Sequence, residues 1–127
     1  MSLTERSRSR IQSFRYAFSG LWYVLRTQRN AWIHATVTVL VILAGLWLRL
    51  DRYDWSLITI AICFVWFSEI INTALEAITD LASPKHHPLA KVGKDVGAGA
   101  VLLASITAVI VGIFILLPRL LDKFNLQ

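Results

Sequence analysis

The chain has 127 residues, of which 56% are hydrophobic, and it carries five tryptophans and a net charge of +5. A soluble helical bundle of this size needs polar outer faces on its helices, and the long apolar runs here offer almost none. The composition therefore excludes an ordinary soluble protein and predicts one integral membrane domain over residues 1–127.

Residues 1–30 are predicted to be a basic segment followed by a helix that lies on the membrane surface. Residues 1–12 are basic and serine-rich and contain no apolar core of the kind a signal peptide has. Apolar side chains then recur at helical spacing, with polar residues elsewhere on the wheel: Phe14, Ala17, Phe18, Leu21, Trp22 and Leu25. A basic amphipathic helix of this kind either anchors the chain in the interface or also helps to cover a site.

Three runs are long enough to span a bilayer as helices, at residues 31–50, 55–82 and 96–117. Asp54 is expected to cap the second span, and Ser83-Pro84 is expected to end it. Pro88 suits the first turn of the third helix. The connection between these two helices is then short, which should keep Asp80 close to Lys94 and Asp95.

The basic residues predict the orientation of the spans. Nine lie before the first span or between the second and third, and four lie on the opposite side with three aspartates. This asymmetry places the N-terminus in the cytoplasm. Because orientation accounts for the positive charge, we expect no nucleic-acid partner.

One face of the second span is acidic. Five polar residues fall at offsets 0, 3, 4, 7 and 11 and so share one side of the helix: Glu69, Asn72, Thr73, Glu76 and Asp80. Carboxylates at membrane depth cost several kcal/mol by most estimates, so such a face predicts a functional site.

Two kinds of chemistry suit this face. Carboxylates can hold Mg²⁺ together with phosphate oxygens, a partly desolvated carboxylate can act as a general base, and Lys94 can contact a phosphate. Intramembrane carboxylates also form ion or proton relays in transporters, whereas a purely structural role does not require so many acids. The pair Lys91 and Lys94 favours a phosphate partner, although the sequence has no G-x-x-x-x-G-K-[ST] loop.

Several motifs resemble the prokaryotic diacylglycerol kinase family over roughly residues 14–118. They are Glu69-x-x-Asn72-Thr73-Ala74-Leu75-Glu76-x-x-x-Asp80, His86-His87-Pro88-Leu89-Ala90-Lys91, Lys94-Asp95-x-Gly97-Ala98-Gly99-Ala100-Val101 and Arg26-Thr27-Gln28-Arg29-Asn30 through His34. The resemblance implies a homotrimer in the bacterial plasma membrane, each subunit having one surface helix and three transmembrane helices. It also implies transfer of the γ-phosphate of Mg·ATP to a lipid hydroxyl, at sites between subunits near the cytoplasmic interface.

Carried over position by position, the resemblance makes Glu69 the general base and Glu76 the metal ligand, with Asn72 and Asp80 in the polar network around them. Lys94 matches the cation that contacts phosphate.

Other matched positions belong to the nucleotide end of the implied site. Asp95 would position Lys94 or the nucleotide, although it can also pair with Lys91 four residues earlier. His87 and Tyr16 would line the nucleotide, although His87 can also be an ordinary loop residue. The family's second metal ligand is a carboxylate, and the matching residue here is Gln28, a weaker ligand for Mg²⁺.

The family divides between diacylglycerol and undecaprenol as acceptors. The His-Pro-Leu-Ala-Lys and Gly-Ala-Gly-Ala-Val segments are more similar to the undecaprenol branch. Small residues at every fourth position of the third span, Ala100, Ala104, Ala108 and Gly112, independently suit close helix packing, and we expect an oligomer.

Overall fold

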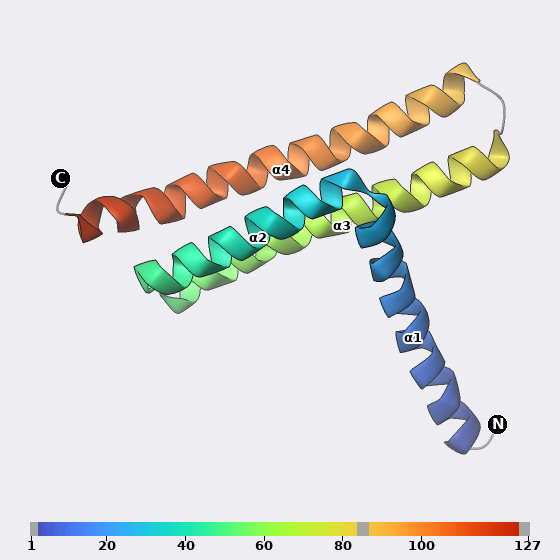
Figure 1. Ribbon diagram of the computed structural model, residues 1–127, viewed down its shortest axis with the longest axis horizontal. Helices are drawn as coiled ribbons and strands as arrows, with labels where there is room; N and C mark the ends of the chain where they lie inside the picture. The colour runs from blue at the N-terminus through green and yellow to red at the C-terminus, as the bar shows by residue number, and fades with distance from the viewer. Residues whose placement is uncertain (1–2, 84–86, 125–127) are drawn as a thin grey trace.

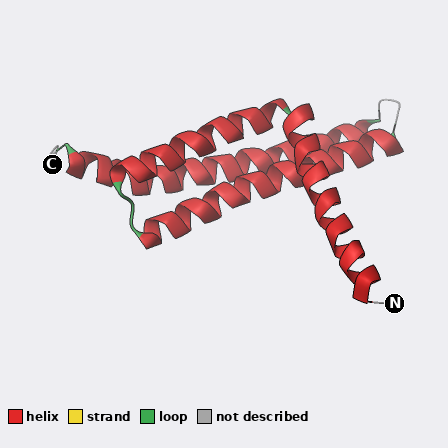
Figure 2. Cartoon of the chain, turned by 60° about the horizontal axis from the view of Figure 1, so that its bottom comes forward, coloured by secondary structure: helices red, strands yellow, loops and turns green. Residues whose placement is uncertain are grey.

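The computed structural model describes residues 3–83 and 87–124, with side chains from residue 10 onward. Four α-helices make up these ranges: α1 (Leu3–Thr27), α2 (Arg29–Leu48), α3 (Arg52–Ala82) and α4 (Pro88–Lys123). Figure 2 shows helices joined by short loops and no strand in the described parts of the chain. The prediction of an all-α fold is confirmed.

Helices α2, α3 and α4 lie side by side and form the body of the molecule (Figure 1). All three are long and apolar enough to cross a membrane. At 1.5 Å per residue, the 20 residues of α2 give a length of about 30 Å, close to the thickness of a bilayer core. The 31 residues of α3 and the 36 of α4 give longer helices, which extend beyond α2 at the end where they are joined to each other (Figure 1).

One helix cap differs from the expected one, and two helices extend beyond the apolar spans. The prediction that Asp54 caps α3 was wrong: Asp51 is the cap, and its side chain accepts from the backbone N–H groups of Tyr53 and Asp54. Pro88 lies in the first turn of α4, as predicted, with His87 as its cap, so this helix begins eight residues before the apolar span predicted from residue 96. It also continues through Pro118 to Lys123. The predicted span ends earlier because hydropathy marks only the membrane-embedded part of a helix. Helix α3 ends at Ala82, and Pro84 lies outside the described residues.

Helix α1 leaves the three-helix body at a steep angle, so its contacts with α2 and α3 are few (Figure 1). Only its last turns pack: Val24 is buried, whereas Phe14, Phe18 and Trp22 of the predicted apolar stripe are exposed within the chain. An exposed aromatic stripe on a basic helix fits a helix that lies on a membrane surface.

The tightest packing joins α3 and α4. Its α4 side is formed by Gly97, Val101, Ala104 and Ile115, and its α3 side includes Ile58 and Val65. Small residues allow this close approach, and Ala104 is buried in the contact as predicted. Ala100, which was also predicted to pack there, is exposed, and Gly97 is the buried small residue nearer the start of α4.

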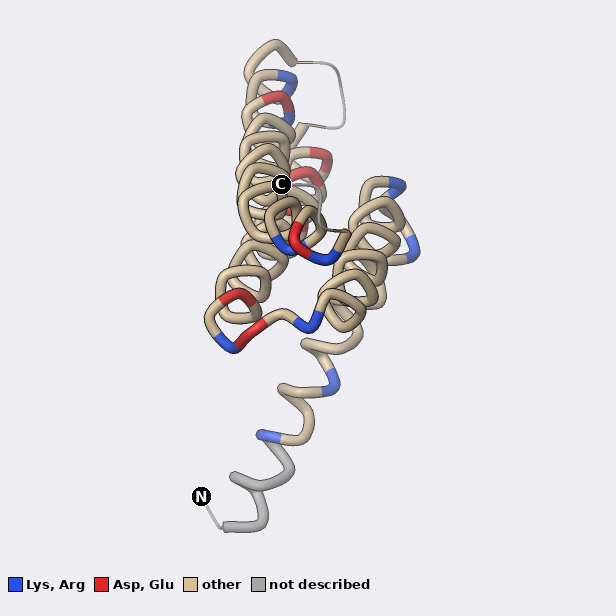
Figure 3. Tube along the Cα trace, turned by 90° about the vertical axis from the view of Figure 1, so that its left-hand side faces the viewer, with Lys and Arg blue, Asp and Glu red and all other residues tan. Residues whose placement is uncertain are grey.

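A cluster of charged residues, here called the lock and formed by Arg119, Asp51 and Asp54, joins the helices at the end opposite the α3–α4 connection. This end is in the foreground of Figure 3. Arg119 of α4 donates to Asp51 and approaches Asp54 at 2.6 Å each, which ties α4 to the turn between α2 and α3. One turn on, the Lys123 ammonium donates to the Trp47 carbonyl at 2.8 Å and lies 4.3 Å from the centre of its ring.

This lock should make stability depend on acid pH. The backbone N–H of Asp54, then that of Tyr53 and the Arg119 guanidinium, hold the pKa of Asp51 below its ordinary value of 3.8. A lowered folded-state pKa adds stability that is complete above pH 3.8 and is lost as pH falls through the folded-state value. We expect Asp51→Asn, which keeps a capping side chain, to flatten the fall in melting temperature below about pH 4. Thermal unfolding in detergent across pH 3–7 measures this difference, and parallel curves for the two proteins would contradict it.

Candidate active site

The acidic face of α3 is present as predicted, and its exposure rises along the helix. Glu69 is 1% exposed, Asn72 and Thr73 are also buried, Glu76 is half-buried, and the Asp80 side chain is 65% exposed. The Thr73 hydroxyl donates to the backbone carbonyl of Glu69 and is thereby satisfied within its own helix. The face therefore runs from a buried carboxylate to an exposed one.

Glu76 is held by two amides from different parts of the chain. The Asn72 Nδ2 donates to Glu76 Oε1 at 3.0 Å, and the Gln28 Nε2 donates to Glu76 Oε2 at 3.1 Å. Gln28 lies between α1 and α2 in extended conformation and does not cap α2 through its side chain. The turn from α1 into α2 therefore places Gln28 beside the middle of the acidic face, in contact with Glu76, the expected metal ligand.

Glu69 faces α2, a helix for which the sequence predicts no site residue. His34 Nε2 lies 3.6 Å from Glu69 Oε2, and the imidazole packs edge-on against Trp66 at 6.4 Å between ring centres. Both Glu69 carboxylate oxygens and His34 Nε2 are buried with no hydrogen-bond partner in the described part of the chain. The signal in the sequence was a lone histidine on an otherwise apolar span, six residues after Gln28.

Lysine side chains meet two of the acids at the exposed end. Lys94 Nζ lies 2.5 Å from Asp80 Oδ1, which joins α3 to α4 and confirms that the short connection brings them together. Lys91 pairs instead with Asp95, also at 2.5 Å and four residues away on α4. Asp95 therefore forms the ion pair with Lys91 that the sequence offered as the alternative to a role in positioning Lys94 or a nucleotide.

Tyr16 and His87, expected to line a nucleotide, lie apart from Glu76. Tyr16 lies on α1 and is 71% exposed. His87 caps α4, and its Nδ1 accepts from the Leu89 backbone N–H at 3.2 Å. His86, in the same motif, lies outside the described residues.

Gly97 was another residue that the sequence did not single out for the site. A Cβ at this position would lie far inside contact distance of Asn72 Oδ1, and 4.0 Å from the Asn72 Cα. The glycine therefore gives the Asn72 amide its space beside α4 and leaves Nδ2 directed at Glu76.

Gly97→Ala should disturb the site more than the fold. The added methyl displaces the end of the Asn72 side chain, which can move, but its hydrogen bond to the Glu76 carboxylate is lost. A hydrogen bond to a charged group is worth about 1.5–3 kcal/mol, so turnover should fall about 10- to 100-fold with little change in melting temperature. Gly99→Ala makes the same change of helix propensity in open space and is the control. Equal turnover of the two variants would show that Asn72 needs no such room.

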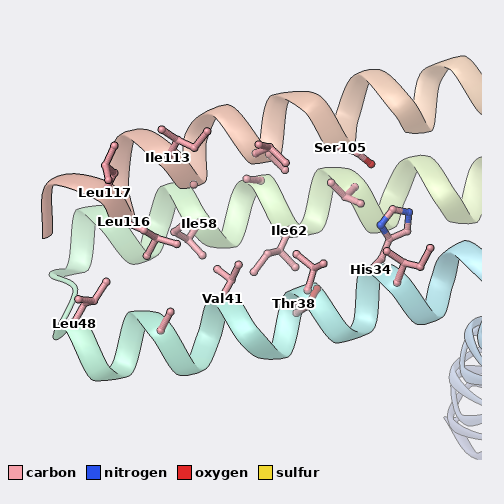
Figure 4. Close-up of a pocket in the computed structure, with 18 of the residues that line it drawn as sticks. His34, Thr38, Val41, Leu48, Ile58, Ile62, Ser105, Ile113, Leu116 and Leu117 are labelled. Carbon is pink, nitrogen blue, oxygen red and sulfur yellow. The ribbon is translucent and has the colours of Figure 1, made fainter. Parts of the chain in front are cut away.

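An apolar groove of about 730 Å³ runs along α2, α3 and α4. Figure 4 shows Leu48, Leu116 and Leu117 at one end, with Val41, Ile58 and Ile62 along its length. His34, Thr38 and Ser105 lie at the other end, and the imidazole of His34 points into the groove (Figure 4). The groove thus leads along the body to the residue that faces Glu69.

The site can bring a carboxylate, amides and an ammonium group to one region. Among the described residues, no cluster of three or more histidine, cysteine, aspartate or glutamate side chains is arranged to hold a metal ion. A hard cation at Glu76 would then draw other oxygen ligands from elsewhere, and Mg²⁺ commonly draws them from phosphates and water. Together, the fold and the site define an integral membrane protein whose acidic site lies toward one end of its spans.

Comparison with known proteins identifies the family. The family model for prokaryotic diacylglycerol kinase matches residues 15–116. A diacylglycerol kinase of Synechocystis sp. is 48% identical over 111 residues, covering 87% of this chain and 63% of that protein. The undecaprenol kinase of Bacillus subtilis is 39% identical, covering 86% and 89%, and the diacylglycerol kinase of Escherichia coli K12 is 32% identical, covering 79% and 82%. The chain belongs to the prokaryotic diacylglycerol kinase family, a family of lipid kinases.

Proposed function

We propose that the protein transfers the γ-phosphate of ATP, as its magnesium complex, to the hydroxyl of a membrane lipid alcohol. The observation that carries this proposal is the Glu69 carboxylate, buried in the helical body with both oxygens unpartnered in the described residues. A carboxylate in such a place is well suited to take a proton from a hydroxyl that arrives through the bilayer.

The other polar residues have complementary roles. Glu76 would hold the cation, and Asn72 and Gln28 orient its carboxylate through the hydrogen bonds they donate. Lys94 would contact the phosphates, with Asp80 as the partner that holds it near the acidic face. Asp95, His87 and Tyr16 remain proposed contacts of the nucleotide. When bound, Mg²⁺ would neutralise phosphate charge during transfer.

The exposed Tyr16 and the long exposed apolar faces support a homotrimer with sites between subunits. A single chain leaves Asp80 at the end of its polar face and the apolar side chains Phe14, Phe18 and Trp22 of α1 exposed. The distribution of basic residues supports a bacterial plasma-membrane protein whose N-terminus and active site lie on the cytoplasmic side, where ATP is available.

For the acceptor we propose undecaprenol, with diacylglycerol as the alternative. The undecaprenol kinase of B. subtilis supports the first, since the match covers 89% of that protein, and the His-Pro-Leu-Ala-Lys and Gly-Ala-Gly-Ala-Val segments resemble the undecaprenol branch. The higher identity to the Synechocystis diacylglycerol kinase favours the second. Both lipids carry a hydroxyl on a long apolar chain, so the apolar groove of the protein does not by itself distinguish undecaprenol from diacylglycerol.

The deciding experiment offers undecaprenol and diacylglycerol side by side in mixed micelles with γ-labelled ATP and Mg²⁺. We expect label in undecaprenyl phosphate, and label only in phosphatidic acid would replace the acceptor with the alternative. The oligomer is first checked by mass in nanodiscs. If the folded protein labels neither lipid, ion or proton transport through the intramembrane acids becomes the better explanation.

Gln28→Glu should alter the response to Mg²⁺. The new carboxylate would lie where an amide now donates to Glu76 Oε2 at 3.1 Å, so two negative charges would repel each other until a cation joins them. We expect a lower half-saturating Mg²⁺ concentration and a steeper dependence of turnover on it. Gln12→Glu adds the same charge on the exposed part of α1 and serves as the control. An unchanged titration would remove Gln28 from the cation site.

A further inference from the structure

The polar atoms of His34 and Glu69 that face each other are too far apart for a hydrogen bond, so neither group satisfies the other. The two atoms, His34 Nε2 and Glu69 Oε2, are 3.6 Å apart, and both are buried without a partner in the described residues. Direct hydrogen bonds of this type are usually shorter than about 3.2 Å. An oxygen atom that enters beside this pair, off the line that joins the two atoms, would satisfy both groups from about 2.7–3.0 Å.

The chemistry of the pair selects the kind of group that binds there. A neutral imidazole can donate through Nε2–H, and an ionised carboxylate accepts only. A group between them must therefore accept one hydrogen bond and donate another, which an alcohol hydroxyl does and an ammonium group does not.

The surroundings fix the imidazole and connect it to the apolar groove. Trp66 packs edge-on against the ring, and its Nε1 donates to Thr38 Oγ1 at 3.2 Å, so the indole is itself held to α2. The ring is 14% exposed and points into the groove. A long apolar body lying in the groove would thus place a terminal hydroxyl beside His34 and Glu69.

We propose that His34 and Glu69 form a two-point clamp on the acceptor hydroxyl, with the apolar body of the lipid in the groove. His34 donates to the hydroxyl oxygen and directs its free lone pair toward the phosphate. That oxygen forms a bond to the γ-phosphorus, the bond from this phosphorus to the β,γ-bridging oxygen breaks, ADP leaves with the electron pair, and the hydroxyl proton passes to Glu69. The clamp rests on the proposed kinase function and adds a second residue that contacts the acceptor.

The test separates donation by His34 from packing. His34→Phe keeps a ring against Trp66 but has no donor, whereas His34→Gln places an amide N–H near the position of Nε2. Turnover on the lipid alcohol at saturating Mg·ATP, the KM for ATP and the melting temperature are measured for both. Thr36→Val is the control, since the Thr36 hydroxyl donates to the Trp32 carbonyl on the exposed side of α2.

We expect His34→Phe to lower kcat about 10- to 100-fold with an unchanged KM for ATP, the loss typical of a hydrogen bond in a charged site. His34→Gln should recover at least about tenfold of that loss, and Thr36→Val should match the wild type. Wild-type turnover in His34→Phe, or equal loss in folded His34→Gln, would overturn the clamp and leave the kinase proposal intact. If His34→Phe does not fold, His34→Gln decides alone: a near-normal rate supports the clamp and a loss above about tenfold overturns it. An inactive wild type would instead refute the kinase function on which the clamp rests.

Discussion

Glu69→Gln should abolish lipid phosphorylation while the protein still binds ATP. The substitution keeps the size and the buried position of the side chain but replaces the proton acceptor by an amide. A positioned general base usually contributes about 10²- to 10⁴-fold, so turnover should fall by that factor. Because Glu76 and Lys94 are unchanged, the affinity for Mg·ATP should stay within about threefold of the wild type.

The experiment measures turnover and nucleotide binding on the same preparation. Removing a buried, unpartnered charge should raise the melting temperature slightly, so loss of activity cannot be attributed to loss of fold. Thr107→Val, in which a hydroxyl bonded to its own helix on an exposed face is removed, is the control for substitution within a span. Near-normal turnover in Glu69→Gln would remove Glu69 from the role of base.

The sequence predicted those features that depend on one helix or on a short connection between two. Periodicity placed Glu69, Asn72, Glu76 and Asp80 on one face, because residues of a single helix keep a fixed angular relation to each other. The short connection predicted the contact between Asp80 and Lys94, because it leaves the two helix ends no room to separate. Hydropathy found three spans, because only apolar stretches of bilayer length can cross.

Contacts between helices away from that short connection were not predicted from the residues alone. His34 faces Glu69, and Gly97 faces Asn72, only because α2 and α4 are rotated about their axes in a particular way. In lipid, apolar residues cover both the outer and the packed faces of a span, so polarity does not reveal this rotation. The spans that hydropathy marked are shorter than α3 and α4, because polar first turns that begin at Arg52 and Pro88 extend these helices beyond the apolar runs.

Glu76→Gln should impair both binding of the metal–nucleotide complex and turnover, in contrast to Glu69→Gln. The side-chain amides of Asn72 and Gln28 both donate hydrogen bonds to the Glu76 carboxylate and so hold it in one orientation. An amide in its place keeps the shape but removes the negative charge that a hard cation requires. Changes in groups that merely support a metal ligand cost about 10- to 100-fold, so loss of the ligand itself should reduce turnover by at least 100-fold.

The contrast between the two variants is the informative result. Mg·ATP should bind at least about tenfold more weakly to Glu76→Gln, whereas ATP without metal should bind equally to both variants. Raising Mg²⁺ should restore part of the turnover of Glu76→Gln and none of that of Glu69→Gln, because only the first defect lies in holding the cation. If Mg²⁺ restores neither variant and both bind Mg·ATP normally, the cation does not depend on Glu76, and the two carboxylates act together on the proton of the acceptor.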